Sequence, residues 1–358
     1  MGKEVKKENS VYGDRKCLIT GINGQDGSYL AEFLIKKGYG VWGTVKRNSV
    51  SETQSTRIEH LRSSGKINLE YADLTDMASL VRVLQMVQPD EIYNLAAQSH
   101  VKVSFDQPIY TANVTGLGTL NLLEAVRMVS PHSKIYQASS SEMFGNNVDE
   151  DGYQRETTPL SPVSPYGCAK VFSYNICRNY RNSYDMKIWN GILFNHESPR
   201  RGTNFVTNKV VKAAVKIKLG LQDNLHLGNL DATRDWGHAK DYVEAMWLML
   251  QTDTPDDYVC STGVSHSVKE LCDYVFNKLD LNYQNYVVIS GKHMRPEELT
   301  DLKGDSTKLR SKLGWEPKYT FETMLDEMVS YWLDYYKESE ITMGIPNEVM
   351  NTILKPRV

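Results

Sequence analysis

The sequence is poor in cysteine and has no paired-cysteine motif and no long apolar run. Its five cysteines are odd in number and form no C-x-x-C pair, and none of the eight histidines has zinc-ligand spacing. We therefore expect neither a disulfide framework nor a metal site. No stretch approaches the roughly 20 apolar residues that a membrane helix needs, and the first residues lack a signal-peptide apolar segment. These absences predict a soluble, cytoplasmic protein with no membrane partner.

An excess of charge of one sign is also missing. Lysine plus arginine number 41 against 44 aspartate plus glutamate, which gives a net charge of −3. Such a balance provides no general attraction for nucleic acid, so no nucleic-acid partner is expected and any bound anion must meet local charges. The 358 residues, of which 41% are hydrophobic, can form a substantial core. Residues 1–13 are polar and are expected to form a flexible tail.

Strand-like and helix-like patterns alternate through the first half of the chain. Lys16–Thr20 is short and apolar, Leu30, Phe33 and Leu34 share one helical face, Gly38 stops that helix, and a second strand runs through Val45. The same reading predicts helices over 77–87 and 111–129, and strands over 67–74, 91–97 and 134–138. This alternation predicts a doubly wound parallel sheet, whose ligand crevice lies beyond the carboxyl ends of its strands.

Three glycines follow the first strand with the spacing G-x-x-G-x-x-G: Gly21, Gly24 and Gly27. They leave a strand and open a helix, and the amide groups of a helix N-terminus bind a pyrophosphate well. A dinucleotide site is therefore predicted, and an ordinary strand-to-helix turn is the alternative.

The end of the second strand bears on which dinucleotide binds. An NAD site places an acid about 20 residues after the glycines, whereas an arginine there suits the 2′-phosphate of NADP. This chain has Lys46 and Arg47 at that place, which favours NADP over NAD unless both belong to a solvated loop. Asp73, which ends the third strand, could accept from the adenine amine or cap the next helix.

The fifth strand ends in three serines and a glutamate, in the stretch KIYQASSSEMFGN. Soon after comes one of three Tyr-x-x-x-Lys pairs, a spacing that lets the ammonium lower the pKa of the phenol, so that tyrosine can act as a base. Tyr166 and Lys170 follow Ser164 and Pro165, which can cap and open a helix beside the serine-glutamate strand. The other two pairs, Tyr12 with Lys16 and Tyr274 with Lys278, are interpreted as chance.

The stretches TGINGQDG, SSSE and YGCAK together resemble the extended short-chain dehydrogenase/reductases, nucleotide-sugar enzymes with a Rossmann-type domain and a smaller C-terminal α/β substrate domain. The stretches LFNHESPRRGTNFVTNKV, LHLGNLDATRDWGHAKDYVEAMWLML and RPEELTDLKGD resemble the GDP-mannose 4,6-dehydratase family, and this resemblance extends from about Lys16 to Trp332. It implies an NADP-binding domain over 14–197, to which 236–264 return, and a substrate domain over 198–235 and 265–358. The residues alone indicate only an NADP-dependent enzyme acting on a nucleotide-linked polyol.

The resemblance implies a lyase that converts GDP-D-mannose into GDP-4-dehydro-6-deoxy-D-mannose and water by internal hydride transfer through NADP. This is the first step toward GDP-L-fucose or GDP-D-rhamnose. Tyr166 and Lys170 would serve the oxidation at C4, Ser140 would hydrogen-bond the reacting oxygen, and Glu142 would carry the elimination across C5 and C6. The family generally has threonine where Ser140 stands, and serine keeps the hydroxyl. The alternatives are another sugar-nucleotide dehydratase or epimerase, and a catalytically silent NADP-binding regulatory protein.

The resemblance also implies two sets of binding residues and an oligomer contact. For the cofactor they are Gly21, Gly24, Gln25, Asp26, Gly27, Arg47, Asp73, Leu74, Leu95, Ala97, Ser99, Tyr110, Tyr166, Lys170, His196 and Arg201. For GDP-mannose they are Ser99, Ser140, Glu142, Tyr166, Asn195, Asn204, Val206, Lys209, Leu227, Gly228, Arg234, Arg295 and Glu298. The polar loop of residues 47–61 would contact a neighbouring subunit of a homotetramer or dimer, and a surface loop is the alternative.

Overall fold

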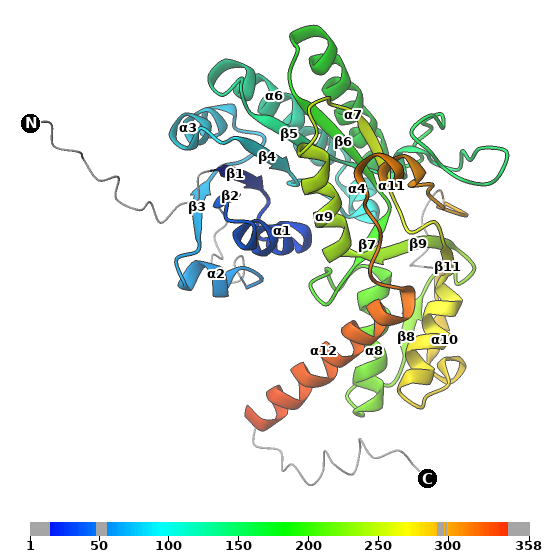
Figure 1. Cartoon of the computed structure of the whole chain (residues 1–358). Coiled ribbons are helices and arrows are strands. Elements are labelled where there is room, and N and C mark those ends of the chain that lie inside the picture. Colours follow the sequence, from blue (N-terminus) through cyan, green and yellow to red (C-terminus); the bar gives the residue numbers. More distant parts are fainter. Residues whose placement is uncertain (1–14, 48–55, 292–296, 298, 343–358) are drawn as a thin grey trace, which may run out of the picture.

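The computed structural model describes residues 15–47, 56–291, 297 and 299–342, and its main element is a seven-stranded sheet (Figure 1). The strands follow the order β10-β6-β5-β4-β1-β2-β3, and every neighbouring pair is parallel. Their bounds are β1 Lys16–Thr20, β2 Gly40–Val45, β3 Ile67–Tyr71, β4 Glu91–Asn94, β5 Lys134–Ser140, β6 Ile188–Leu193 and β10 Asp257–Cys260. The predicted fold class, a doubly wound parallel sheet, is confirmed.

Helices cover both faces of this sheet (Figure 1). One face packs against α1 (Gln25–Lys36) and α9 (Ala239–Leu250), and the other against α3 (Met77–Val87), α6 (Gly118–Val129) and α7 (Pro165–Tyr184). Each face of the sheet has its own apolar core. On β1, Ile19 belongs to the core beneath α1 and α9, and its neighbour Leu18 belongs to the core beneath α3, α6 and α7. Successive side chains of a strand point to opposite faces, so an apolar strand supplies both cores.

A second lobe carries its own apolar core. It contains the helices α8 (Val206–Lys218), α10 (Val268–Lys278) and α12 (Phe321–Thr342), which lie beside one another in the lower part of Figure 1. A three-stranded sheet of order β11-β9-β7 joins it to the first lobe, and a two-stranded sheet pairs β12 with β8. These strands are β7 Asn195–Glu197, β8 Leu225–Leu227, β9 Thr233–His238, β11 Ser265–Ser267 and β12 Val287–Ile289.

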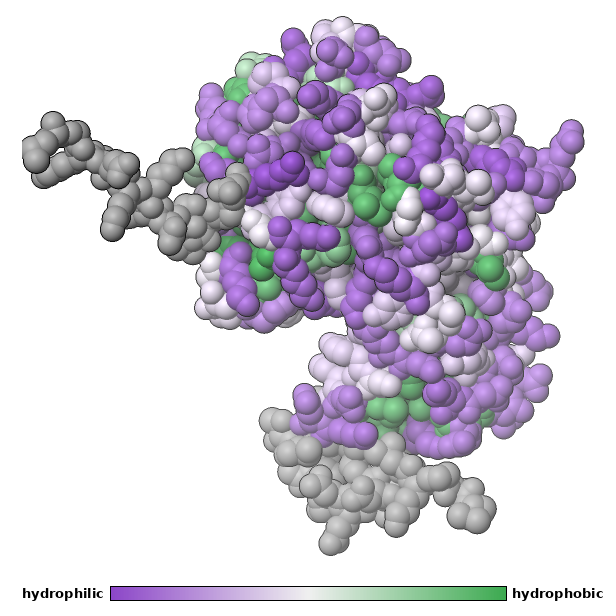
Figure 2. Space-filling view, viewed as in Figure 1, coloured by the Kyte–Doolittle hydropathy of each residue, from purple (hydrophilic) through white to green (hydrophobic). Residues whose placement is uncertain are grey.

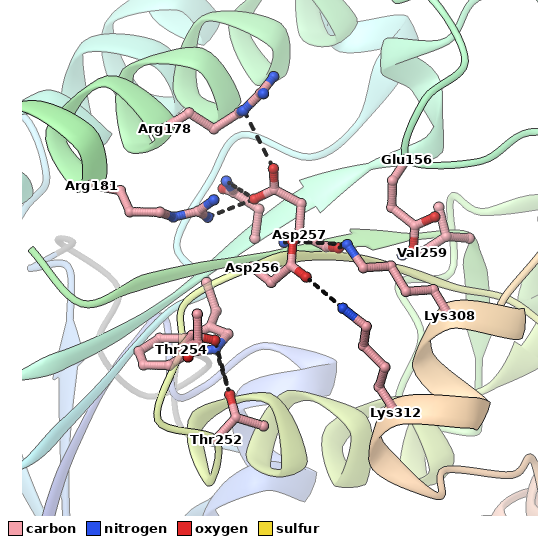
Figure 3. Close-up of polar contacts among 12 residues, drawn as sticks. Glu156, Arg178, Arg181, Thr252, Thr254, Asp256, Asp257, Val259, Lys308 and Lys312 are labelled. Atoms are coloured by element: carbon pink, nitrogen blue, oxygen red, sulfur yellow. Dashed lines mark hydrogen bonds and ion pairs between the residues drawn. The ribbon is translucent and has the colours of Figure 1, made fainter.

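The chain returns from the second lobe to the first more than once. β10 adds an edge strand beside β6, and α11 (Thr307–Leu313) packs on β10, where Leu309 and Trp315 join the core beneath α1 and α9. The sequence-based division assigns 265–358 to the substrate domain, and these domain limits stay a prediction. Figure 3 shows the ion pairs that hold β10 and α11 in the first lobe. Asp257 pairs with Arg178 and Arg181 of α7, and Asp256 pairs with Lys308 and Lys312 of α11.

Several element boundaries differ from those predicted. The strands expected over 67–74 and 91–97 end at Tyr71 and Asn94. After Asn94 the backbone leaves the ladder because the amides of Leu95 and Ala96 donate to Thr20 Oγ1, both at 3.1 Å. The single helix expected over 111–129 is divided into α5 (Pro108–Thr111), a π-helical turn (Ala112–Leu117) and α6. The remaining short helices are α2 (Glu59–Ser63), α4 (Val101–Asp106) and 3₁₀ turns at Ser141–Met143 and Tyr283–Asn285.

The face seen in Figure 2 is mainly hydrophilic. Figure 2 shows one face on which hydrophobic residues form small, separate patches among hydrophilic ones. Of the helices in the described part of the chain, none combines the length and the apolar character required to cross a membrane.

Candidate active site

A cavity of about 660 Å³ opens at the carboxyl ends of the parallel strands and extends to β8 and β9 of the second lobe. This is the crevice where doubly wound sheets bind ligands, and its volume suits a small-molecule site. Most residues predicted from the sequence lie in its wall: Gly21, Gly24, Gln25, Asp26, Gly27, Asp73, Leu74, Leu95, Ala97, Ser99, Tyr110, Ser140, Glu142, Tyr166, Lys170, Asn195, His196, Arg201, Asn204, Val206, Lys209, Leu227, Gly228 and Arg234. Arg47 does not line the cavity, and Arg295 and Glu298 lie outside the described residues.

The glycine turn leaves the start of α1 open to the cavity. Gly24 is the N-cap residue and offers no side chain to the first-turn amides. A Cβ atom on Gly27 would lie 2.5 Å from the Gly21 carbonyl oxygen, and Gly21 itself has φ +68°. The chain can therefore turn this tightly only with glycine, and the exposed helix N-terminus fits the pyrophosphate of a dinucleotide.

Four residues expected to carry the chemistry come from β5, the 3₁₀ turn that follows it, and α7. β5 ends at Ser140, whose hydroxyl accepts from the Glu142 amide at 3.2 Å and hydrogen-bonds Tyr166. Ser164 caps α7 by accepting from the Gly167 amide at 3.0 Å, which places Tyr166 in the first turn of the helix beside β5. The hydroxyls, the carboxylate and the phenol therefore share one part of the cavity wall.

Burial shifts the pKa values of Tyr166 and Lys170. Burial lowers the pKa of Lys170 to about 8 and raises the pKa of Tyr166 to about 12, although the hydrogen bond with Ser140 opposes the rise at Tyr166. Lys170 Nζ donates to the Ala138 carbonyl at 2.6 Å and lies 5.7 Å from the centre of the Tyr166 ring. The ammonium is thus anchored to the end of β5, close to the Tyr166 ring.

Lys46 and Arg47 face opposite ways at the end of β2. Lys46 lines the cavity, with Nζ 3.3 Å from Asp73 Oδ2 and a hydrogen bond to the Tyr110 hydroxyl at 3.2 Å. Arg47 donates to the hydroxyl of Tyr71 at 3.2 Å, away from the cavity wall. Sequence reasoning named both cations and placed only Arg47 among the cofactor contacts. The alternation of side chains along a strand is the signal that separates the two.

Asp73 does not cap the helix that follows it. Its Oδ1 accepts from the Thr75 amide at 2.9 Å, and the N-cap of α3 is Asp76, which accepts from Ala78 and Ser79. Asp73 therefore has its carboxylate on the cavity side beside Lys46. Of the two alternatives that the sequence left open, this placement favours a ligand contact.

Strand β7 carries a polar group that sequence reasoning identified only in part. Asn195 and His196 were predicted, but Glu197, 1% exposed, also lines the cavity. Burial raises the pKa of Glu197, and its carboxylate pairs with Arg201 Nε at 3.2 Å and accepts from the Thr207 hydroxyl. Glu197 holds the arginine that faces the cavity, and the run of three polar residues after a buried strand was the signal for it.

The second Tyr-x-x-x-Lys pair in the described residues has a structural role. Tyr274 donates to Asp326 Oδ1 at 2.9 Å, and Lys278 Nζ lies 3.0 Å from Oδ2 of the same carboxylate. These contacts join α10 to α12, and neither residue lines the main cavity. The interpretation of this pair as non-catalytic fits its position, whereas Tyr12 lies outside the described residues.

Two solved structures with the same architecture are sugar-nucleotide enzymes in complex with NAD. A UDP-glucose 4-epimerase of Thermus thermophilus in complex with NAD is 26% identical, with a TM-score of 0.77 over 88% of this chain and 98% of that one. A dTDP-glucose 4,6-dehydratase of Bacillus anthracis in complex with NAD is 22% identical, with a TM-score of 0.77 over 90% and 98%. The fold and the cavity thus define an extended short-chain dehydrogenase/reductase.

The sequence comparisons are more specific. A sequence model of the family described as GDP-mannose 4,6 dehydratase matches residues 18–328. GDP-mannose 4,6 dehydratase 2 of Arabidopsis thaliana is 50% identical over 347 residues, which are 94% of this chain and 92% of that protein. GDP-mannose 4,6 dehydratase of Homo sapiens is 50% identical over 338 residues, or 87% and 90%. The chain belongs to the GDP-mannose 4,6-dehydratase family.

Proposed function

We propose that this protein is a lyase that converts GDP-D-mannose into GDP-4-dehydro-6-deoxy-D-mannose and water with the help of a bound nicotinamide cofactor. The observation that carries the proposal is the family match over 18–328, together with a cavity whose wall brings Ser140, Glu142, Tyr166 and Lys170 into one place. The product is a precursor of GDP-L-fucose or GDP-D-rhamnose.

The first step is oxidation at C4 of the mannose ring. A nicotinamide cofactor supplies reversible hydride transfer when it is bound. Tyr166 accepts the proton of the 4-hydroxyl, and Ser140 hydrogen-bonds the oxygen that becomes the carbonyl. Because burial alone would hold Tyr166 protonated, the positive charge of Lys170 is needed to favour the phenolate.

The second step is the loss of water across C5 and C6. A carbonyl at C4 acidifies the C5 proton, and Glu142 removes it and delivers a proton to the departing C6 hydroxyl. Tyr166 stays engaged with the C4 oxygen, so a second proton-transfer group is required, and the turn after β5 supplies it. A bound nicotinamide would return to C6 the hydride that it took from C4. The proton that Tyr166 took from the 4-hydroxyl balances the one added at C5, so the net loss is one water.

We propose NADP as the nicotinamide cofactor. Lys46 at the cavity wall offers its ammonium to a 2′-phosphate, and Arg47 adds positive charge nearby. At the substrate end, Lys209 and Arg234 line the cavity and are suited to the diphosphate of a GDP-sugar.

We also propose a homodimer or homotetramer in the cytoplasm. The predicted contact is the 47–61 loop, of which residues 48–55 lie outside the described residues. Arg57, in its described part, donates to the Arg200 carbonyl at 2.8 Å, which brings this part of the loop beside the segment that follows β7. Four of the five cysteines are buried free thiols, which suits a reducing compartment.

The test is to incubate the purified protein with GDP-mannose, with and without added NADP, and to follow the nucleotide sugars by mass spectrometry. We expect a product lighter by one water. Glu142→Gln should permit partial oxidation and block elimination, whereas Glu150→Gln, a change of an exposed carboxylate outside the cavity wall, should turn over normally. Full dehydratase turnover by Glu142→Gln would refute its role, and unchanged GDP-mannose with the wild-type protein would refute the function.

A further inference from the structure

His196 lies between two hydrogen-bond acceptors. Its Nδ1 is 2.7 Å from the Phe194 carbonyl oxygen, and its Nε2 is 2.7 Å from Asp26 Oδ2. A carbonyl oxygen has no proton to donate, and an ionised carboxylate has none either. Both ring nitrogens must therefore donate, which requires the doubly protonated, positively charged imidazolium.

His238 provides a contrast within the same molecule. Its Nδ1 accepts from the Lys240 amide at 3.0 Å, and its Nε2 lies 3.2 Å from Glu327 Oε2. Both histidines are buried and both face a carboxylate, but the second partner is a donor at His238 and an acceptor at His196. A nitrogen that accepts an amide hydrogen carries no proton, so the His238 ring holds only one.

The groups around His196 come from several elements. The ion pair of His196 with Asp26 of α1 has five charged or titratable neighbours: Glu197 on β7, Arg201 after β7, Tyr166 and Lys170 on α7, and Tyr136 on β5. The ring of Tyr242, on α9, stacks on the imidazole with 4.5 Å between the ring centres. Burial opposes both charges, yet the pairing lowers the pKa of Asp26 and raises the pKa of His196. The electrostatics therefore agree with the geometry.

The pair joins two parts of the site that are far apart in sequence. Asp26 lies in the first turn of α1, between Gly24 and Gly27, and His196 lies on β7, where the chain enters the second lobe. Gln25 strengthens the same junction, because its amide donates to the His196 carbonyl at 3.0 Å and its Oε1 accepts from Ser198 at 2.7 Å. Three neighbouring contacts thus fix the start of α1 to β7.

We propose that His196 is a permanent imidazolium and that its ion pair with Asp26 positions the glycine turn against β7. A ring with both nitrogens donating cannot take up another proton, so His196 is a positioning residue and not a general base. The proposal rests on the proposed function in one respect: it takes NADP to be the ligand that binds more tightly because the glycine turn is held against β7.

The wild-type protein permits a direct test. The full chain, labelled with ¹⁵N in the histidine rings, would be titrated from pH 6 to 9 by NMR, and the His196 signals assigned by their loss in His196→Gln. We expect both His196 nitrogens to be protonated at pH 8, where an ordinary histidine is only about 3% charged. We expect His238 to show a single-proton ring in the same spectra. A singly protonated His196 at pH 8 would overturn the proposal.

A variant separates charge from shape. Asp26→Asn keeps the volume of the side chain and removes the negative charge, so His196 should become singly protonated at pH 8. The dissociation constant for NADP⁺, measured by calorimetry, should rise about tenfold, as expected for a lost charge-assisted contact. Asp273→Asn, an exposed change on α10 outside the main cavity, should leave both measurements unchanged.

Neither measurement requires turnover of GDP-mannose. If the wild-type protein forms no product while His196 is doubly protonated and Asp26→Asn weakens NADP⁺ binding, the proposed function fails and this inference stands. If Asp26→Asn binds NADP⁺ as tightly as the wild type, the positioning role is refuted whatever the enzyme turns over.

Discussion

At the scale of single residues, two neighbouring cations at the end of β2 have different environments. Lys46 reaches the cavity wall between Asp73 and Tyr110, whereas Arg47 lies over the Tyr71 ring, 5.4 Å from its centre. Their distance in sequence from the glycine turn does not show which of the two side chains faces the cavity. If the cofactor is NADP, as proposed, their placement makes Lys46 the candidate for the contact with the 2′-phosphate.

We therefore expect Lys46→Met to raise the dissociation constant for NADP⁺ about tenfold and to leave that for NAD⁺ nearly unchanged, because only NADP⁺ carries the phosphate. Arg47→Met is the matched control and should have a smaller effect. Calorimetric titration of both dinucleotides into each variant gives the comparison. A larger loss in Arg47→Met would assign the phosphate contact to Arg47 instead.

At the scale of elements, the position of Tyr166, the proposed catalytic tyrosine, depends on where α7 begins. Ser164 accepts from the Gly167 amide, and Pro165 occupies the first helical position, where its missing N–H costs nothing. Tyr166 follows at once, so the cap also sets how the phenol meets Ser140.

We expect Ser164→Ala to lower the free energy of unfolding by about 1 kcal/mol, since an N-cap hydroxyl is lost. Turnover should fall as well, because the first turn carries Tyr166. Ser164→Thr keeps the hydroxyl and should stay close to the wild type. Urea denaturation measures the stability, and equal losses in the two variants would show that packing, not capping, is responsible.

Much of the element pattern could be predicted from local signals, and the misses have physical causes. The helix over Met77–Val87 is confirmed, because Pro89 and the apolar spacing mark it in the sequence. The early end of β4 depends on the Thr20 hydroxyl, 74 residues away in sequence from Asn94, and no local pattern reveals such a contact. The cavity position of the glycine turn and of Tyr166 follows from motifs, whereas the burial of Glu197, 1% exposed, depends on packing that its local sequence does not specify.

At the scale of the whole molecule, α12 ties the second lobe to the first. Glu327 lies 3.2 Å from His238 Nε2 and 2.8 Å from Lys240 Nζ at the junction of β9 and α9. The hydrogen bond from His238 and the pairing with Lys240, although opposed by partial burial, lower the pKa of Glu327 to about 2. The carboxylate therefore stabilises the folded state in its ionised form.

The lowered pKa of Glu327 determines how its contribution to the free energy of unfolding changes with pH. The folded-state pKa lies below the ordinary value of 4.5, so the contribution is fully present above pH 4.5 and is lost as the pH falls toward 2. We expect Glu327→Gln to be less stable than the wild type by about 2 kcal/mol at pH 7, with the difference shrinking below pH 4.5. Denaturation curves across this range provide the measurement. Glu316→Gln changes a largely exposed partner of Arg310 and should alter the free energy of unfolding only slightly. A loss of stability as large as that of Glu327→Gln would contradict this account.

The repeated passage of the chain between lobes bears on how the protein is made. The edge strand β10 and the covering helix α9 belong to the first lobe, yet both are translated after β7, α8 and β9. A ribosome-bound chain that has released only the residues up to the end of β7 still lacks an edge strand and α9, one of the two helices over one face of its sheet. The two lobes must therefore be completed together during synthesis, and cleavage between them would not release an intact first lobe.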